Sequence, residues 1–166
     1  MSENFKPEIE KKYLIKNVPF DFTKFPSIEI IQGYISEPGD DLTIRIRKYG
    51  NKYFRTLKKK GFESRLESEE EISQDEFDLL WSKTIGKRIS KTRYRIPYLE
   101  FIIELDVFKD NLDGLVIAEV EFKTLEQSKN FNPPDWFGED VTFLPKYSNS
   151  YLSKFGYQPK QENSIS

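Results

Sequence analysis

The sequence contains no cysteine and no histidine. The missing cysteines exclude disulfides, zinc–thiolate sites and thiol nucleophiles, and the missing histidines exclude imidazole ligands and histidine general bases. No stretch approaches the roughly 20 apolar residues that a membrane-spanning helix needs, and residues 1–4 do not begin a signal peptide. Catalysis would therefore depend on carboxylates, lysine, arginine, hydroxyl groups and metal ions. We expect a cytoplasmic location and no membrane partner.

A large excess of charge of one sign is also absent, because 28 acidic and 26 basic residues give a net charge of −2. This balance argues against a nucleic-acid surface, so no nucleic-acid partner is expected. The content of charged residues, 33%, together with 15% aromatic residues, indicates a folded chain. The 166 residues suit one domain, which we expect over residues 1–157, followed by a polar tail at residues 158–166.

Short segments of alternating polarity, separated by turn signals, predict a mainly β fold. The expected strands lie at about residues 8–15, 28–36, 42–48, 52–60, 64–72, 88–96, 99–108 and 114–122. Strands that follow one another closely favour antiparallel pairing between sequential strands. Turn-forming residues predict connections at Tyr49–Asn51, Gly61–Phe62, Pro97–Tyr98 and Asp110–Gly114.

Helix signals interrupt the strand pattern at three places. Residues 74–85 are preceded by Ser73, which has the spacing of a capping box with Glu76, and are followed by Gly86 as a stop. The apolar face of this helix, which we expect to pack on the barrel, comprises Phe77, Leu80, Trp81 and Ile85. Two further helices are expected, a short one from about residue 124 and a last one over residues 147–156.

Charged residues recur at every second position in most of the predicted strands, which places them on one strand face. The alternating sets are Glu8, Glu10 and Lys12; Thr43, Arg45 and Arg47; Arg65, Glu67, Glu69 and Glu71; Lys91, Arg93 and Arg95; Glu100, Ile102, Glu104 and Asp106; and Glu119, Glu121 and Lys123. For a single pair of glutamates, exposure to solvent is the simpler interpretation. Its repetition along the chain favours a closed eight-stranded barrel with the charged face inward. The apolar faces would then be covered, in part, by the 74–85 helix, the aromatic segment 131–143 and the C-terminal helix.

A cavity lined by both carboxylates and cations restricts the possible ligands. Carboxylates without histidine or cysteine select hard, oxygen-preferring cations such as Mg²⁺ or Mn²⁺. Lysine and arginine in the same cavity require an anion. A polyphosphate satisfies both groups, because metal ions bridge phosphate oxygens and guanidinium groups bind them bidentately. The pattern therefore indicates a small-molecule polyphosphate bound together with a divalent cation.

Ordered motifs along residues 8–152 resemble those of the CYTH superfamily, also called triphosphate tunnel metalloenzymes. Glu8-Ile9-Glu10-Lys11-Lys12 matches the family's ExExK signature. The other matching motifs, in the family's order, are Gln32-Gly33-Tyr34-Ile35, Arg45-Ile46-Arg47, Thr56-Leu57-Lys58, Arg65-Leu66-Glu67-Ser68-Glu69, Lys91-Thr92-Arg93-Tyr94, Glu104-Leu105-Asp106-Val107-Phe108, Glu119-Val120-Glu121-Phe122, Pro133-Pro134-Asp135-Trp136-Phe137-Gly138 with Val141-Thr142, and Tyr147-Ser148-Asn149. The ordered set is specific, whereas ExExK alone would not be. The chain departs from the family pattern at Phe143-Leu144-Pro145, which we expect at a rim.

The resemblance implies an eight-stranded antiparallel tunnel with a charged interior and a few flanking helices. It implies metal ligands at Glu8, Glu10, Asp106, Glu119 and Glu121, and phosphate contacts from Lys12, Arg45, Arg47, Lys58, Arg65, Lys91 and Arg93. The implied catalytic set is Glu8, Glu10, Glu119, Glu121 and Lys91. Glu67, Glu69 and Glu104, like Arg65, are either direct ligands or salt-bridge partners that orient the ligands.

Without an appended helical domain, the chain resembles the short bacterial inorganic triphosphatases most. The implied reaction is metal-dependent hydrolysis of tripolyphosphate, or of a nucleoside triphosphate, by attack of water. A class IV-type adenylyl cyclase is the alternative enzyme. The aromatic residues that would then stack on adenine, although such residues more often pack in a core, are Tyr13, Tyr34, Tyr53, Phe54 and Tyr94.

A non-catalytic binder of polyphosphate or nucleotide is a third interpretation, in which the carboxylates only bind the metal that accompanies the ligand. A carrier of apolar ligands is disfavoured, because it would bury these charges beside an apolar guest. The sequence leaves the preferred metal and the oligomeric state open, a homodimer included.

Overall fold

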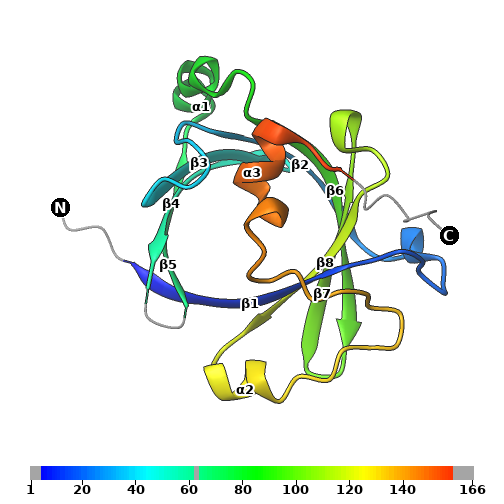
Figure 1. The fold of residues 1–166 in the computed structure, drawn as a ribbon. Coiled ribbons are helices and arrows are strands. Elements are labelled where there is room, and N and C mark those ends of the chain that lie inside the picture. The colour runs from blue at the N-terminus through cyan, green and yellow to red at the C-terminus, as the bar shows by residue number, and fades with distance from the viewer. Residues whose placement is uncertain (1–4, 62–63, 159–166) are drawn as a thin grey trace, which may run out of the picture.

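The structure, a computed structural model, describes residues 5–61 and 64–158. Figure 1 shows its eight strands as a closed antiparallel barrel, which confirms the predicted fold class. The strands are β1 (Lys6–Leu14), β2 (Ser27–Tyr34), β3 (Leu42–Tyr49), β4 (Lys52–Lys60), β5 (Arg65–Ile72), β6 (Arg88–Tyr98), β7 (Phe101–Phe108) and β8 (Val116–Phe122). The α-helices are α1 (Gln74–Trp81), α2 (Leu125–Lys129) and α3 (Asn149–Phe155), and 3₁₀ helices lie at Phe22–Lys24, Ser82–Thr84, Asp110–Leu112 and Pro145–Tyr147. Residues 159–166 of the predicted tail lie outside the described residues. Among the described residues, no helix has the length and apolar character that a membrane span requires.

The strand order around the barrel is β1-β5-β4-β3-β2-β6-β7-β8, with β8 bonded back to β1. Sequential pairing was therefore predicted correctly for most strands, but it is wrong for β1 with β2 and for β5 with β6. The first strand must close the barrel by filling the place between β8 and β5, because an open edge would leave backbone groups unpaired. With β1 in that position, β2 pairs with β6 instead.

Two of the predicted turns are confirmed and one is displaced. Tyr49 pairs with Lys52, so Gly50 and Asn51 form the β3–β4 turn, and residues 110–114 connect β7 to β8. The expected turn at Pro97–Tyr98 is wrong, because β6 continues to Tyr98, which pairs with Phe101. Proline is tolerated there because the register between β6 and β2 ends at Tyr94, so the missing N–H of Pro97 would have no partner strand. Of the turn expected at Gly61–Phe62, Phe62 lies outside the described residues, and the Gly61 N–H donates to the Ser64 carbonyl at 2.9 Å.

Helix α1 packs on the outer face of β3, β4 and β5. Ser73 caps the helix by accepting a hydrogen bond from the Glu76 N–H at 3.1 Å. Phe77 is buried against the outward residues Ile46 and Ile72, as the predicted apolar face requires. Ile85 was wrongly placed on that face, since it is 73% exposed. The α-helix ends at Trp81 and a 3₁₀ turn follows, which breaks the 3.6-residue spacing.

A second outer cluster covers β6, β7, β8 and the end of β1. Its buried members include Tyr13, Leu105, Val120 and Phe131, so the aromatic segment covers the barrel as predicted. Trp136 packs edge-on against Phe20 with ring centroids 5.5 Å apart. These contacts bury the apolar strand faces outside the barrel and leave the alternate residues facing inward.

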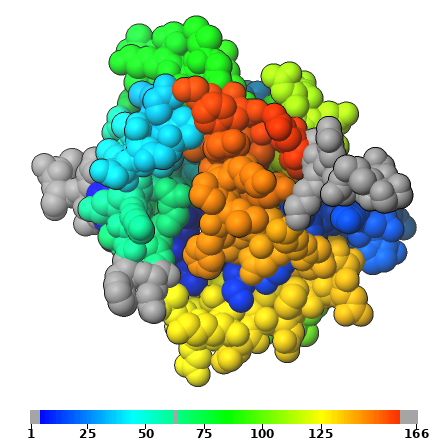
Figure 2. Space-filling view, in the orientation of Figure 1, coloured from blue at the N-terminus to red at the C-terminus, as the bar shows by residue number. Residues whose placement is uncertain are grey.

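Helix α3 lies across one end of the barrel, in front of the ring of strands in Figure 1. Its Leu152 packs with Ile89, Phe108 and Ile117, which lie two residues from Lys91, Asp106 and Glu119 on the inward strand faces. Figure 2 shows the C-terminal segment, orange to red, spread across this face of the molecule. The prediction that this helix covers the outside is therefore wrong, because its apolar residue contacts inward-facing side chains.

Residues 138–142 bind the part of β1 that β5 does not reach. The register between β1 and β5 contains only Lys6, Pro7 and Glu8 on the β1 side. Further along β1, the Gly138 N–H donates to the Leu14 carbonyl at 2.8 Å and the Leu14 N–H donates to the Glu139 carbonyl at 2.9 Å. These bonds satisfy backbone groups of β1 that would otherwise lack a strand partner.

A Gly138→Ala substitution should weaken this attachment. An added Cβ would lie 2.5 Å from the Leu14 carbonyl oxygen, so the backbone of one segment would have to shift. We expect the free energy of unfolding, measured by urea denaturation, to fall by about 1–3 kcal/mol. The control is Asp135→Ala, at an exposed position in the same segment, for which a change within about 0.5 kcal/mol is expected. Unchanged stability of Gly138→Ala would contradict close packing of this segment on β1.

Candidate active site

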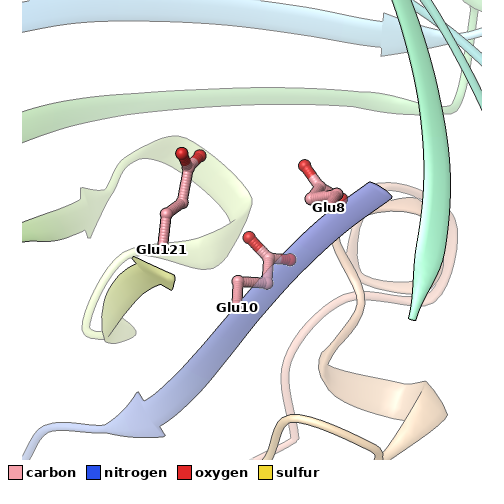
Figure 3. Close-up of side chains that lie close together, drawn as sticks. All are labelled: Glu8, Glu10 and Glu121. Carbon is pink, nitrogen blue, oxygen red and sulfur yellow. The ribbon is translucent and has the colours of Figure 1, made fainter. Parts of the chain in front are cut away.

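Three carboxylates gather at one place inside the barrel. Glu10 of β1 lies opposite Glu121 of β8, and Glu8 follows on the same face of β1. Each offers an oxygen that lies within 4.8 Å of the others, and Figure 3 shows the three side chains close together. Glu8 and Glu10 are partly buried, whereas Glu121 is exposed to the adjoining cavity of about 480 Å³. We call Glu8, Glu10 and Glu121 the acidic cluster.

The acidic cluster carries negative charge that is only partly neutralised. Burial and then repulsion from Glu119 raise the pKa of Glu10. Removal from water and the neighbouring carboxylates, Glu104 and Glu10 first, raise the pKa of Glu121 to about 7. Like charges this close in a weakly polarisable interior favour either protonation or a bound cation. Three carboxylates and no nitrogen or sulfur donor fit a hard divalent ion such as Mg²⁺ or Mn²⁺.

The raised pKa values predict that rising pH lowers the stability of the metal-free protein and strengthens Mg²⁺ binding. A carboxyl group whose pKa is raised by folding binds its proton more tightly in the folded protein, so the protonated form stabilises the fold. For Glu121 this contribution to stability is lost as the pH rises from about 4.5 through about 7. Mg²⁺ binding requires the deprotonated form and should therefore strengthen over the same interval. We expect the increase in Tm produced by Mg²⁺ to be larger above pH 7 than below it. An increase independent of pH would contradict the assignment.

Deeper in the barrel, Arg93 joins three strands through ion pairs. Its guanidinium donates to both oxygens of Asp106, at 2.8 and 3.0 Å, and to Glu119 at 2.8 Å. It also contacts Glu104 at 3.3 Å. Burial opposes ionisation of Asp106, yet Arg93 and Lys91 hold the pKa of that carboxyl below its usual range. Arg93 therefore has its donors committed to carboxylates, and it positions Asp106 and Glu119.

Lys91 is completely buried beside this network. Its Nζ lies 2.7 Å from an Asp106 oxygen and donates to the Asn149 side chain of α3 at 3.2 Å. Burial lowers the pKa of Lys91 to about 8, although Asp106 opposes the shift. Both Asp106 oxygens are thus bound by cations, and Asp106 is not a member of the acidic cluster. Asp106 as a metal ligand stays a prediction.

Two further lysines lie between the carboxylates of β1 and those of neighbouring strands. Lys12 contacts Glu119 at 3.5 Å and Glu10 at 3.8 Å. Lys58 lies 3.1 and 3.2 Å from the two oxygens of Glu8. Burial would raise the pKa of Glu8, but Lys58 lowers it to about 2. Glu8 and Glu119 therefore stay ionised without a metal, because each has an ammonium group beside it.

Arg47 makes no ion pair with any carboxylate in the described part of the chain, unlike Lys12, Arg45, Lys58, Lys91 and Arg93. Its Nε donates to the buried Gln32 side chain at 3.0 Å. Burial and the neighbouring Arg45 and Arg93 lower its pKa to about 10. Arg45, 6% exposed, donates to Thr56 at 3.0 Å and reaches Glu69 only at 3.4 Å, and its Nε has no hydrogen-bond partner among the residues that the structure describes. The two arginines thus supply donors and positive charge for an anion.

Three polar residues that carry no role in the sequence analysis hold these cations in place. Gln32 accepts from Arg47 and donates to the Tyr34 hydroxyl at 2.9 Å. Thr56 donates to Glu69 at 2.8 Å while accepting from Arg45, and Asn149 accepts from Lys91. For Gln32 a signal existed in the sequence, because a polar residue on the inward face of an apolar strand must find a buried partner.

The remaining predicted residues lie in different places, some exposed or packed outside the barrel and two on its inward face. Arg65 is exposed and donates to the Thr43 hydroxyl at 3.3 Å. Tyr13, Tyr53 and Tyr94, considered as adenine platforms, instead pack against aromatic residues outside the barrel, with centroid distances of 4.8 Å to Phe137, 4.9 Å to Phe77 and 5.0 Å to Phe22 respectively. Tyr34 and Phe54 lie opposite Arg45 and Arg47 and so share the inward face.

Comparison with known proteins places this geometry in a family. The CYTH domain family model matches residues 6–155. The inorganic triphosphatase of Nitrosomonas europaea is 40% identical over 148 residues, which cover 88% of this chain and 96% of that protein. The inorganic triphosphatase of Acetivibrio thermocellus is 35% identical over 158 residues, covering 93% and 98%. The crystal structure of an inorganic triphosphatase matches with a TM-score of 0.66 at 37% identity, covering 92% of this chain and 96% of its own. The chain, with its closed barrel and inward-facing charges, therefore belongs to the CYTH domain family.

Proposed function

We propose that this protein is a divalent-metal-dependent triphosphatase that hydrolyses inorganic tripolyphosphate. The observation that carries the proposal is the presence, in one barrel, of Arg47, which has no carboxylate partner among the described residues, and of an acidic cluster with excess negative charge. A triphosphate with its divalent cation neutralises both at once. The relatives named inorganic triphosphatase, at 40% and 35% identity, support the same substrate.

The acidic cluster would hold the divalent cation. When bound, such an ion polarises phosphoryl oxygens and lowers the pKa of a water molecule. Arg47 and Arg45 would bind the phosphate oxygens and offset the charge that spreads onto them as the phosphoanhydride bond breaks. Lys12 and Lys58 add positive charge beside the cluster, and Arg93 holds Glu119 in its orientation.

The attacking group in this proposal is water, because the chain has neither cysteine nor histidine to serve as a nucleophile or a base. The water oxygen forms a bond to the terminal phosphorus, and the bond to the bridging oxygen breaks. Tripolyphosphate and water then give orthophosphate and pyrophosphate. Fixed charges and positioning supply most of the rate enhancement, since no covalent intermediate is required.

A substrate panel tests the proposal. Tripolyphosphate, ATP, GTP and thiamine triphosphate would each be incubated with Mg²⁺ and with Mn²⁺, and the products separated by ion chromatography. We expect orthophosphate and pyrophosphate from tripolyphosphate, with the highest kcat/KM of the panel, and no release in EDTA. Formation of cyclic AMP and pyrophosphate from ATP would establish a cyclase instead. Metal-dependent binding of every triphosphate without any product would identify a binding module and overturn the proposal.

A further inference from the structure

Lys58 already binds the carboxylate that the metal would need. Its Nζ lies 3.1 and 3.2 Å from the two Glu8 oxygens and 3.9 Å from Glu67. The Lys58 and Glu8 side chains are only 15% and 12% exposed, so water screens the pair weakly. The Lys58 ammonium group, in contact with both oxygens of Glu8, occupies the place that a divalent metal ion would take at this member of the acidic cluster.

Lys58 also lies next to the residues assigned to the anion. It follows Thr56 by two positions on the inward face of β4, and Thr56 accepts a hydrogen bond from Arg45. The lysine side chain is a flexible stem with a compact charge, so its ammonium group can reach partners that lie a few ångströms apart. A phosphate bound by Arg45 and Arg47 would be a second acceptor within this range.

We propose that Lys58 competes with the divalent cation for Glu8, and that a bound phosphate group attracts the ammonium away and frees Glu8 for the metal. Metal and anion then bind with positive coupling, and by linkage each raises the affinity of the other by the same factor. This inference rests on the proposed function, since it assumes that both ligands enter this barrel. Its consequence is that the ligand-free protein binds metal weakly.

Mn²⁺ binding without turnover measures this coupling. Free Mn²⁺ would be counted by electron paramagnetic resonance during titration of the protein, with sulfate as the tetrahedral anion and chloride at equal ionic strength as its control. For the wild-type protein we expect sulfate to raise the Mn²⁺ affinity by about fivefold or more. For Lys58→Met we expect tighter Mn²⁺ binding in chloride and a sulfate effect below about twofold.

Lys12→Met separates a specific role from a general charge effect. Lys12 also faces the interior, at 3.8 Å from Glu10, but it does not bind both oxygens of a cluster carboxylate. Its removal should change Mn²⁺ affinity while leaving the sulfate effect at the wild-type factor. Where Lys58→Met does not fold, Lys58→Gln serves, because its amide can still donate to Glu8 without the charge.

The proposal would be overturned if sulfate raised the Mn²⁺ affinity of a folded Lys58 variant by the same factor as in the wild type. It would also be overturned if that variant bound Mn²⁺ more weakly than the wild type in chloride. The experiments distinguish failure of the proposed role of Lys58 from failure of the proposed triphosphatase function. A wild-type protein that couples Mn²⁺ to sulfate but releases no phosphate from any triphosphate would contradict hydrolysis and leave the role of Lys58 intact. Hydrolysis without coupling would contradict the role of Lys58 alone.

Discussion

An Arg47→Gln protein should be more heat-stable than the wild type without ligand, and nearly inactive. Burial and two neighbouring arginines lower the pKa of the Arg47 guanidinium to about 10, so its positive charge destabilises the empty barrel. Glutamine removes the charge and keeps an amide that can donate to Gln32. We expect the Tm of the ligand-free protein to rise by a few degrees. We expect kcat/KM for tripolyphosphate to fall by about a hundredfold to a thousandfold, since arginine offsets charge that develops in the transition state.

The matched control for this variant is Arg55→Gln in β4. Arg55 lies on the outer face, where it pairs with Glu70 and Glu76, and its side chain is 38% exposed. Exposed ion pairs contribute little, so we expect wild-type turnover and a stability change within about 1 kcal/mol. If Arg47→Gln retained wild-type kcat/KM while Arg55→Gln behaved as expected, Arg47 would not bind the substrate.

Replacement of Glu121 by glutamine should abolish metal-dependent turnover in a folded protein. Glu121 is exposed to the cavity and makes no ion pair among the described residues, so the substitution removes repulsion and breaks no salt bridge. A bound metal contributes several kcal/mol of charge stabilisation, and each 1.36 kcal/mol is tenfold in rate, so we expect a loss of about a thousandfold. The Tm of the ligand-free variant should equal or exceed that of the wild type.

Thermal shift with increasing Mg²⁺ completes the test, because loss of a ligand should reduce the increase in Tm that the metal produces. Glu100→Gln is the control, since Glu100 is an exposed glutamate in the turn between β6 and β7, away from the acidic cluster. Wild-type turnover in Glu121→Gln would remove Glu121 from the metal site. A normal metal response combined with lost turnover would assign Glu121 to the chemistry alone.

These predictions share a physical origin. The acidic cluster concentrates negative charge, and Arg47 carries a positive charge with no ion-pair partner in residues 5–61 and 64–158. Both arrangements are unfavourable until a ligand neutralises them. A site of this kind lowers the stability of the empty protein in exchange for affinity, as is common at active sites. The effects of Arg47→Gln and Glu121→Gln on stability and on turnover should therefore have opposite signs.

Much of the fold could be predicted from local patterns. Period-two alternation placed all eight strands within a few residues of their observed bounds, because alternation follows directly from strand geometry. The cap at Ser73 was equally readable, since its hydroxyl accepts from the N–H three residues on. The position of β1 between β5 and β8 was not readable, because its partners lie far along the chain and no local rule selects them.

The candidate site, like the fold, could be predicted from the sequence only in part. The sequence by itself determined which residues face the interior, because every second residue of a strand must point to the same side. It did not distinguish Arg47 from Arg93, which stand in similar charged alternations. Only the tertiary structure decided that Arg93 lies against Asp106 and Glu119 while Arg47 forms no ion pair in the described chain. The physical reason is that the net charge around a side chain is set by neighbours on other strands, and strand order and register bring those neighbours together.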